Sequence, residues 1–311
     1  MLEVAWPQLD VLSKCQRKEI CLPNSFLSIQ SQLQKRLDEL TRAEKQLAHI
    51  LMENYPASAL GSITELAQRS GVSTPTVARL VQKLGFDGFP QFQQALRAEV
   101  SATLSNPISK HENWAKNTPG THILNRFAEA VSQNMRQTFS RISSEKFDEV
   151  CNLLADNDRS LHIVGGRISR SLADYLFTHI QVVRSGVTHM TSNSNAWPHY
   201  ILDMEEGDVL VIFDVRRYEN DLRRLAEMTH ERGVKIILFT DQWGSPVSKV
   251  ATHKFSCHIE VPSAWDSSVV TMLLLEAIIA EVQGRNWENT KERMRTLEGL
   301  FDRTRLFRKF T

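Results

Sequence analysis

Hydroxyl groups followed by cations mark the first stretch that could bind a ligand, a helix expected to begin at Ser73. Apolar residues recur there at helical spacing and are expected to face inward: Val77, Leu80, Val81 and Leu84. The positions expected to face outward carry short hydroxyls first and cations later: Ser73, Thr74, Thr76, Arg79 and Lys83. Arginine and lysine reach base edges and phosphates in the major groove, so this pattern fits a DNA-reading helix. A helical hairpin with a solvated face explains it equally well, because residues 41–100 hold only 6 basic and 5 acidic side chains.

A glycine-rich turn is the second such stretch and directly follows the apolar run Leu161–Val164. It combines two glycines, a cation and a hydroxyl: Gly165, Gly166, Arg167 and Ser169. Where a turn of this kind opens a helix, the free backbone N–H groups favour anions. Its glycine spacing differs from Gly-x-Gly-x-x-Gly, which disfavours a dinucleotide. A plain strand-to-helix turn, in which the glycines permit close packing, is the alternative.

Two arginines between acids form the third stretch, in which Asp214, Arg216 and Arg217 follow the apolar run 208–213. An arginine can grip a carboxylate or a phosphate through two parallel N–H donors. Together with the glycine-rich turn, these residues predict an anion site at the carboxyl edge of a sheet. Two hydroxyls either join this site or cap the helix expected at 269–282: Ser267 and Ser268. The alternative is an internal salt network in which Asp214 or Glu219 neutralises the arginines.

No residues point to catalysis, a metal or a cofactor. The four cysteines lack Cys-x-x-Cys spacing and are expected to be reduced thiols. The ten histidines show neither His-x-x-x-His nor His-Glu-x-x-His. We therefore expect no catalytic residue, no metal ion and no cofactor.

The elements that must position these residues begin with helices over residues 26–100. Thr41–Glu44 and Ser62–Glu65 each have the spacing of a capping box. Gly71 suits a tight turn between the helices at 62–70 and 73–84, which gives helix-turn-helix proportions. In residues 101–120, 11 of 20 positions are Ser, Thr, Asn, Pro or Gly, which is typical of a linker.

Beyond residue 160 the pattern alternates between strands and helices. Short apolar runs at 161–164, 208–213 and 234–239 are separated by helical stretches, which indicates a parallel sheet buried on both faces. A charged amphipathic helix is expected from residue 285 onward. The predicted fold class is α/β overall, with an all-helical N-terminal domain and an α/β domain whose central parallel sheet is flanked by helices.

Length and charge restrict the class of protein. A chain of 311 residues corresponds to about two domains. The formal net charge of +1 excludes a surface that is basic overall, although it leaves room for a local basic patch. No apolar run reaches the roughly 18 residues that a membrane span needs, and residues 1–10 lack a signal-peptide pattern. We therefore expect a cytoplasmic protein without a membrane partner.

The helix-turn-helix stretch resembles that of RpiR-type bacterial transcriptional regulators. The resemblance rests on Ile63–Ala67, on Gly71–Arg79 and on Leu84–Phe89, which reads Leu-Gly-Phe-x-Gly-Phe, an ending specific to that family. Residues 125–283 are similar to a SIS domain, the sugar-phosphate-binding fold that follows the helix-turn-helix in this family. Three residues match its Gly-x-Gly-x-Ser-x-x-x-Ala motif, in which the second glycine is Arg167 here: Gly165, Ser169 and Ala173.

The resemblance implies the domain organisation and the partners. We expect an N-terminal extension at 1–25, a helix-turn-helix domain at 26–102, a linker at 103–121, a SIS effector domain at 122–284 and a C-terminal helix at 285–311. The implied function is transcriptional regulation, in which the protein binds double-stranded operator DNA as a homodimer or homotetramer. Its SIS domain would sense a small effector and so control operator binding.

One departure from the family pattern bears on the effector. SIS domains that bind sugar phosphates usually carry Ser-x-Ser-Gly-x-Thr where Asp214–Glu219 reads Asp-Val-Arg-Arg-Tyr-Glu. We therefore expect an anionic effector, phosphosugar-like or an organic acid, that is held by charge more than through hydroxyls. The alternative function is a SIS-fold sugar-phosphate isomerase with an accessory helical domain. It is disfavoured because an isomerase needs a poised general base, and neighbouring arginines would lower the pKa values of Asp214 and Glu219.

Overall fold

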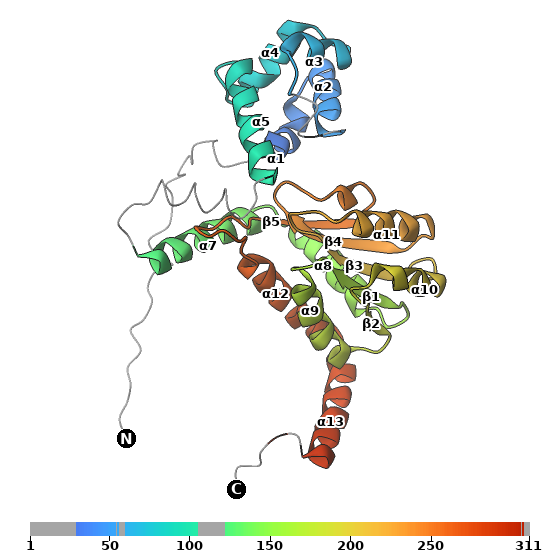
Figure 1. Cartoon of the computed structure of the whole chain (residues 1–311). Coiled ribbons are helices and arrows are strands. Elements are labelled where there is room, and N and C mark those ends of the chain that lie inside the picture. The colour runs from blue at the N-terminus through green and yellow to red at the C-terminus, as the bar shows by residue number, and fades with distance from the viewer. Residues whose placement is uncertain (1–28, 54, 56–59, 105–121, 306, 308–311) are drawn as a thin grey trace. The chain divides into compact units, whose positions relative to one another are not determined.

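The computed structural model describes residues 29–53, 55, 60–104, 122–305 and 307 (Figure 1). The chain forms two compact units, Met1–Arg97 and Ala98–Thr311, and each is considered by itself. The expected N-terminal extension lies outside the described residues, as does the expected linker from residue 105 onward.

The first unit is helical. Its helices are α1 (Ile29–Lys35), α2 (Arg42–Glu53), α3 (Ile63–Arg69), α4 (Thr74–Lys83) and α5 (Phe89–Leu104), and a short 3-10 turn spans Leu37–Glu39. The boundary between the two units falls within α5, after Arg97. Buried side chains from all five helices form one core, which includes Leu33, Leu47, Leu66, Leu80 and Phe92. Burial of this apolar surface is the main driving force that holds such short helices together.

Both expected capping boxes are present. The Thr41 N–H donates to Glu44 Oε2 at 2.8 Å and the Glu44 N–H donates to Thr41 Oγ1 at 3.4 Å. Ser62 and Glu65 exchange the same pair of bonds at the start of α3. Gly71 has φ +62° in the turn before α4, a conformation that glycine adopts at little cost. These features fix where α2 and α3 begin and where the chain turns from α3 into α4.

The second unit contains a five-stranded sheet in the order β2-β1-β3-β4-β5, and all its neighbouring strands are parallel. The strands are β1 (Leu161–Gly165), β2 (Val187–His189), β3 (Val209–Phe213), β4 (Lys235–Asp241) and β5 (His253–Cys257). The three expected apolar runs form β1, β3 and β4, and β1 and β3 are buried at every position. The short strand β2 was not expected, because its three residues are all only half buried and show no apolar run.

Helices cover both faces of this sheet (Figure 1). One face packs against α8 (Ser144–Ala155), α9 (Arg170–Val183) and α12 (Val269–Arg285). The other face packs against α10 (Trp197–Leu202), which follows a 3-10 turn at Ser194–Ala196, and α11 (Asn220–Glu231). A further 3-10 turn, η5 (Pro246–Lys249), lies between β4 and β5. The predicted α/β fold class is confirmed.

Two more helices flank this core. Helix α7 (Ile123–Phe139) contacts α12 and β5, and α13 (Trp287–Thr304) follows α12 and contacts α9. The Arg293 guanidinium donates to the carbonyls of Gln181 and Val182, so α13 caps the C-terminal end of α9. Among the described residues, no helix is long and apolar enough to cross a membrane.

Candidate DNA-reading helix and effector site

Helix α4 presents one exposed face with polar character. Val77, Leu80, Val81 and Leu84 are buried as expected, while Thr74 and Arg79 are exposed. Gln82, which the sequence analysis did not select, is exposed three residues after Arg79, a spacing that places the two side chains on neighbouring positions of one helix face.

Thr76 does not face outward, and that expectation is wrong. Its side chain is only 6% exposed. The Thr76 and Ser73 hydroxyls share a hydrogen bond of 2.9 Å, and Arg79 Nη2 lies 3.4 Å from Thr76 Oγ1 as a donor. Thr76 lies four residues before Leu80, a spacing that places both on the inward face. The hydroxyl therefore contacts side chains of its own helix.

Lys83 is paired within the domain. Its Nζ lies 2.7 Å from Oε2 of Glu44, a side chain that is only 4% exposed. Burial alone would raise the pKa of Glu44, but hydrogen bonds from Lys83 and from Thr41 lower it below its usual value. The pair joins the last turn of α4 to the first turn of α2, while the Lys83 side chain stays partly exposed.

The candidate effector residues gather at the carboxyl ends of the parallel strands. After β1 the chain adds β2 toward one edge of the sheet, whereas after β3 it adds β4 toward the other edge. The order in which strands are added therefore reverses between the neighbouring strands β1 and β3. Ligands of open α/β sheets bind outside the carboxyl ends of the strands at such a point. The turn after β1 and the loop after β3 flank it.

The turn after β1 is tightly packed. The Gly166 N–H and the Ser169 hydroxyl both donate to the Phe213 carbonyl, at 3.1 and 2.7 Å. A Cβ on Gly165 would lie 2.7 Å from the Ser169 carbonyl oxygen, and one on Gly166 would lie 2.7 Å from Glu219 Oε1. The glycines are therefore needed for close packing of the chain.

Arg167 and Glu219 join the two flanking loops across this point. The Arg167 N–H donates to Glu219 Oε1 at 2.6 Å, so a carboxylate of the chain itself binds this backbone donor. The Arg167 side chain is exposed.

Arg216 is held by a residue that the sequence analysis did not select. Its guanidinium donates through Nε and Nη2 to the Asp266 carboxylate, at 3.2 and 2.5 Å, and lies 4.2 Å from the ring centre of Trp243. The Arg216 side chain is 3% exposed. An internal salt pair was one of the two expectations, but its acid is Asp266 rather than Asp214 or Glu219. Asp266 lies 50 residues further along the chain, where no local pattern marks it.

Arg217 differs from its neighbour. Its side chain is exposed, and it makes no hydrogen bond or ion pair within the part of the chain that the structure describes. The exposed cations beside the point of strand reversal thus include Arg167 and Arg217.

Asp214 is a buried acceptor and is 1% exposed. Its carboxylate accepts hydrogen bonds from the Ser245 hydroxyl and the Glu219 N–H. The expectation that arginines lower its pKa is wrong, because burial raises the pKa of Asp214 to about 6. A carboxylate so enclosed and bonded is not placed to take a proton from a substrate.

Asp241 ties the loops after β3 and β4 together. Its carboxylate accepts from the Tyr218 hydroxyl at 2.7 Å, from the Arg216 N–H at 2.8 Å and from the Trp243 N–H at 2.9 Å. Burial raises the pKa values of Asp241 and Tyr218, and the neighbouring Asp241 adds to the shift of Tyr218. These bonds fix the backbone around the two arginines.

The two serines before α12 differ in role. Ser267 is buried, and its hydroxyl accepts from the Val269 N–H at 3.3 Å, which is the capping alternative. Ser268 is exposed and makes no side-chain capping bond.

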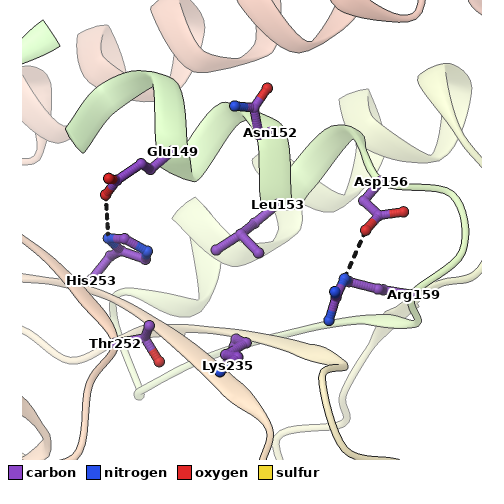
Figure 2. Close-up of a pocket in the computed structure, with 8 residues that line it drawn as sticks. All are labelled: Glu149, Asn152, Leu153, Asp156, Arg159, Lys235, Thr252 and His253. Carbon is purple, nitrogen blue, oxygen red and sulfur yellow. Dashed lines mark hydrogen bonds and ion pairs between the residues drawn. The ribbon is translucent and has the colours of Figure 1, made fainter. Parts of the chain in front are cut away.

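A pocket of about 350 Å³ lies at the opposite edge of the sheet. Figure 2 shows it between α8 and the starts of β4 and β5, where Lys235 and His253 lie. Its acids are bonded to neighbouring bases, Glu149 to His253 at 3.6 Å and Asp156 to Arg159 at 2.7 Å. None of the expected effector residues lines it.

Family models match both units of the chain. Residues 27–103 match the helix-turn-helix domain of the rpiR family, and residues 153–281 match the SIS domain. The protein is 23% identical over 277 residues to the HTH-type transcriptional regulator HexR of Pseudomonas aeruginosa. This match covers 86% of this chain and 93% of HexR. It is 26% identical over 251 residues to the bifunctional protein glk of Burkholderia thailandensis. That match covers 78% of this chain but only 37% of glk.

Two solved structures share the fold. The sugar isomerase domain of an RpiR transcription factor from Sphaerobacter thermophilus superposes with a TM-score of 0.52 at 20% identity and covers 56% of this chain and 97% of that one. The Vibrio vulnificus NanR protein, complexed with ManNAc-6P, superposes with a TM-score of 0.52 at 16% identity and covers 88% and 98%. The chain belongs to the RpiR-type transcriptional regulators, with an rpiR-family helix-turn-helix domain followed by a SIS domain.

Proposed function

We propose that this regulator reads its operator through the exposed face of α4 and that a small anion bound by the SIS domain changes operator binding. The observation that carries the proposal is the exposed Arg79 on the second helix of a capped helix-turn-helix. Ser73 and Thr74 lie at the start of that helix, which is the end that enters the major groove in this motif. Lys83 contributes charge toward phosphates from its partly exposed side chain.

The effector proposal rests on the cations beside the point of strand reversal. Arg167 and Arg217 offer exposed guanidinium groups there, and an anion can bind them through paired N–H donors. NanR, whose structure shares this fold, was solved with ManNAc-6P. We infer a phosphosugar-like or organic acid effector of this chain. Gly165, Gly166, Ser169, Asp214, Arg216, Ser267 and Ser268 shape and support the site.

The proposed assembly is a homodimer or homotetramer in the cytoplasm. Helix-turn-helix proteins commonly read two half-sites with two copies of the domain. Helix α13 carries exposed apolar side chains at Trp287 and Leu300 that a partner copy would cover. Light scattering on the full-length protein at micromolar concentration should give a mass of at least two chains, and a monomer mass contradicts this proposal.

We further propose that the chain is not an enzyme. The two acids at this edge whose pKa values are raised, Asp214 and Asp241, are buried and accept hydrogen bonds from Ser245 and Tyr218. Incubation with phosphorylated aldoses and ketoses, followed by NMR, should show no interconversion. Isomerisation that the Asp214→Asn variant abolishes would favour the enzyme instead.

The function is tested in two steps on the full-length protein. Selection from random duplex DNA identifies an operator, and fluorescence anisotropy then measures its dissociation constant. A thermal-shift screen of phosphorylated sugars and small organic acids next finds effectors, because a ligand that binds the folded state raises its stability. A hit should change the operator dissociation constant. Failure to select any duplex overturns DNA reading, and a screen without hits overturns anion sensing.

A further inference from the structure

We propose that Thr76 is a positioning residue for DNA recognition, whose buried hydroxyl holds the Arg79 guanidinium in the orientation that reads a base pair. The inference rests on the proposed function, in which Arg79 contacts the operator. It assigns Thr76 a specificity role although its side chain is too buried to contact DNA itself.

Three polar side chains on successive turns of α4 form a connected series. The Ser73 hydroxyl and the Thr76 hydroxyl lie 2.9 Å apart, and Arg79 Nη2 donates toward Thr76 Oγ1 from 3.4 Å. A hydroxyl has one hydrogen and two acceptor positions, so Thr76 can bond both neighbours at once. Thr76, in the middle of the series, is buried and held by the packed helix, whereas Ser73 and Arg79 at its two ends are exposed.

Ser73 supports this arrangement because its hydroxyl is not used as a helix cap. A serine at this position usually accepts a bond from the N–H two or three residues later. Here the side chain makes no such bond, and the Thr76 N–H donates instead to the Ser73 carbonyl oxygen at 2.9 Å. The hydroxyl pair is thus available to orient Arg79.

The physical benefit is preorganisation. A free arginine side chain samples many rotamers, and binding one base pair costs that freedom. One N–H of Arg79 bonded to Thr76 restricts the rotamers while leaving the other donors available to paired acceptors on a guanine. Lys83, which pairs with Glu44, does not compete for the Thr76 hydroxyl.

The test is a double-mutant cycle on the full-length protein, with a duplex selected by the wild-type protein as the probe. Thr76→Val keeps the side-chain size but removes the hydroxyl, and it should weaken binding about three- to tenfold. Thr76→Ser, which keeps the hydroxyl, should bind within about twofold of wild type. In an Arg79→Ala background, Thr76→Val should cause no further loss, because Thr76 acts through Arg79.

Two further variants keep the test decisive. Ser73→Ala removes the other half of the hydroxyl pair and should cause a smaller loss that also vanishes without Arg79. Ser70→Ala removes a buried hydroxyl that bonds no described residue, and it should leave affinity unchanged. Thermal unfolding confirms that each variant is folded, and if Thr76→Val does not fold, the cycle is run with Ser73→Ala.

The outcomes separate the inference from the function on which it rests. Equal losses from Thr76→Val with and without Arg79 mean a structural role and overturn the inference. No loss from Thr76→Val, while Arg79→Ala weakens binding, also overturns it and leaves DNA reading by Arg79 intact. Full binding by Arg79→Ala overturns the proposed role of Arg79 and the inference together.

Discussion

The Arg216 guanidinium and the Asp266 carboxylate form a bidentate ion pair that joins the loop after β3 to the segment before α12. The ring of Trp243, from the loop after β4, lies against the same guanidinium. One buried cation therefore links three loops at the carboxyl edge of the sheet. Its charge is matched inside the protein, so its main effect is on the positions of these loops.

Replacement of Arg216 by alanine should destabilise the protein. The change leaves the Asp266 carboxylate without its cation in a largely covered site, which typically costs about 3 kcal/mol of unfolding free energy. Chemical denaturation monitored by circular dichroism measures this loss. Asp266→Asn should lower stability in the same direction. An Arg216→Ala protein as stable as wild type would show that the pair does not hold the loops.

Replacement of Arg217 by alanine should act on the effector instead. This side chain is exposed and bonds no other described residue, so its removal should leave the melting temperature unchanged. Loss of a hydrogen bond to a charged ligand weakens binding by about 1.5–3 kcal/mol, or about 10- to 160-fold. Titration of a hit from the effector screen measures this change. Arg223→Ala on α11, a partly exposed arginine paired with Glu227, is the control and should bind the effector normally.

Replacement of Lys83 by methionine should lower stability by about 1 kcal/mol, because Lys83 is partly exposed and Glu44 keeps its bonds to Thr41. The pKa of Glu44 is lowered in the folded state, so its contribution is present above the ordinary value of 4.5 and is lost as pH falls further. Urea denaturation between pH 7 and pH 3 should therefore show a smaller acid-dependent loss in Lys83→Met than in wild type. Identical pH profiles would contradict the pairing.

The pattern of apolar residues in the sequence predicted the strands that are buried along their whole length and the helices that are buried on one face. The runs that form β1 and β3 are apolar at nearly every position because helices cover both faces. Thr76 was expected to face outward because it is polar, although its spacing of four residues from Leu80 is that of the inward face. The hydroxyl is accommodated inside because Ser73 and Arg79 bond it.

The parts of the site that sequence could not predict depend on distant contacts. The pairs Arg216–Asp266 and Lys83–Glu44 join residues 50 and 39 positions apart. Charge alone does not select a partner, since Asp214 and Glu219 are nearer to Arg216 in sequence. Packing of the loops decides which carboxylate meets the guanidinium. Burial likewise raised the pKa of Asp214, whereas adjacent arginines in the sequence suggested the opposite.

His258, directly after β5, should make stability depend on pH between about 6.5 and 4. Its ring is buried with no hydrogen-bond partner for Nε2 among the described residues, and the backbone N–H of His258 donates to Thr138 Oγ1. Burial, aided by the nearby Arg141, lowers the pKa of His258 to about 4. The unfolded chain takes up the proton near pH 6.5, so the folded state loses stability as pH falls toward 4. A shift of this size corresponds to about 3 kcal/mol of unfolding free energy.

Denaturation of the His258→Gln variant at pH 7, 5.5 and 4.5 should show a flatter dependence of stability on pH than wild type. The control variant His199→Gln, at an exposed position, should follow wild type. A His258→Gln profile parallel to that of wild type would show that this imidazole does not titrate with unfolding.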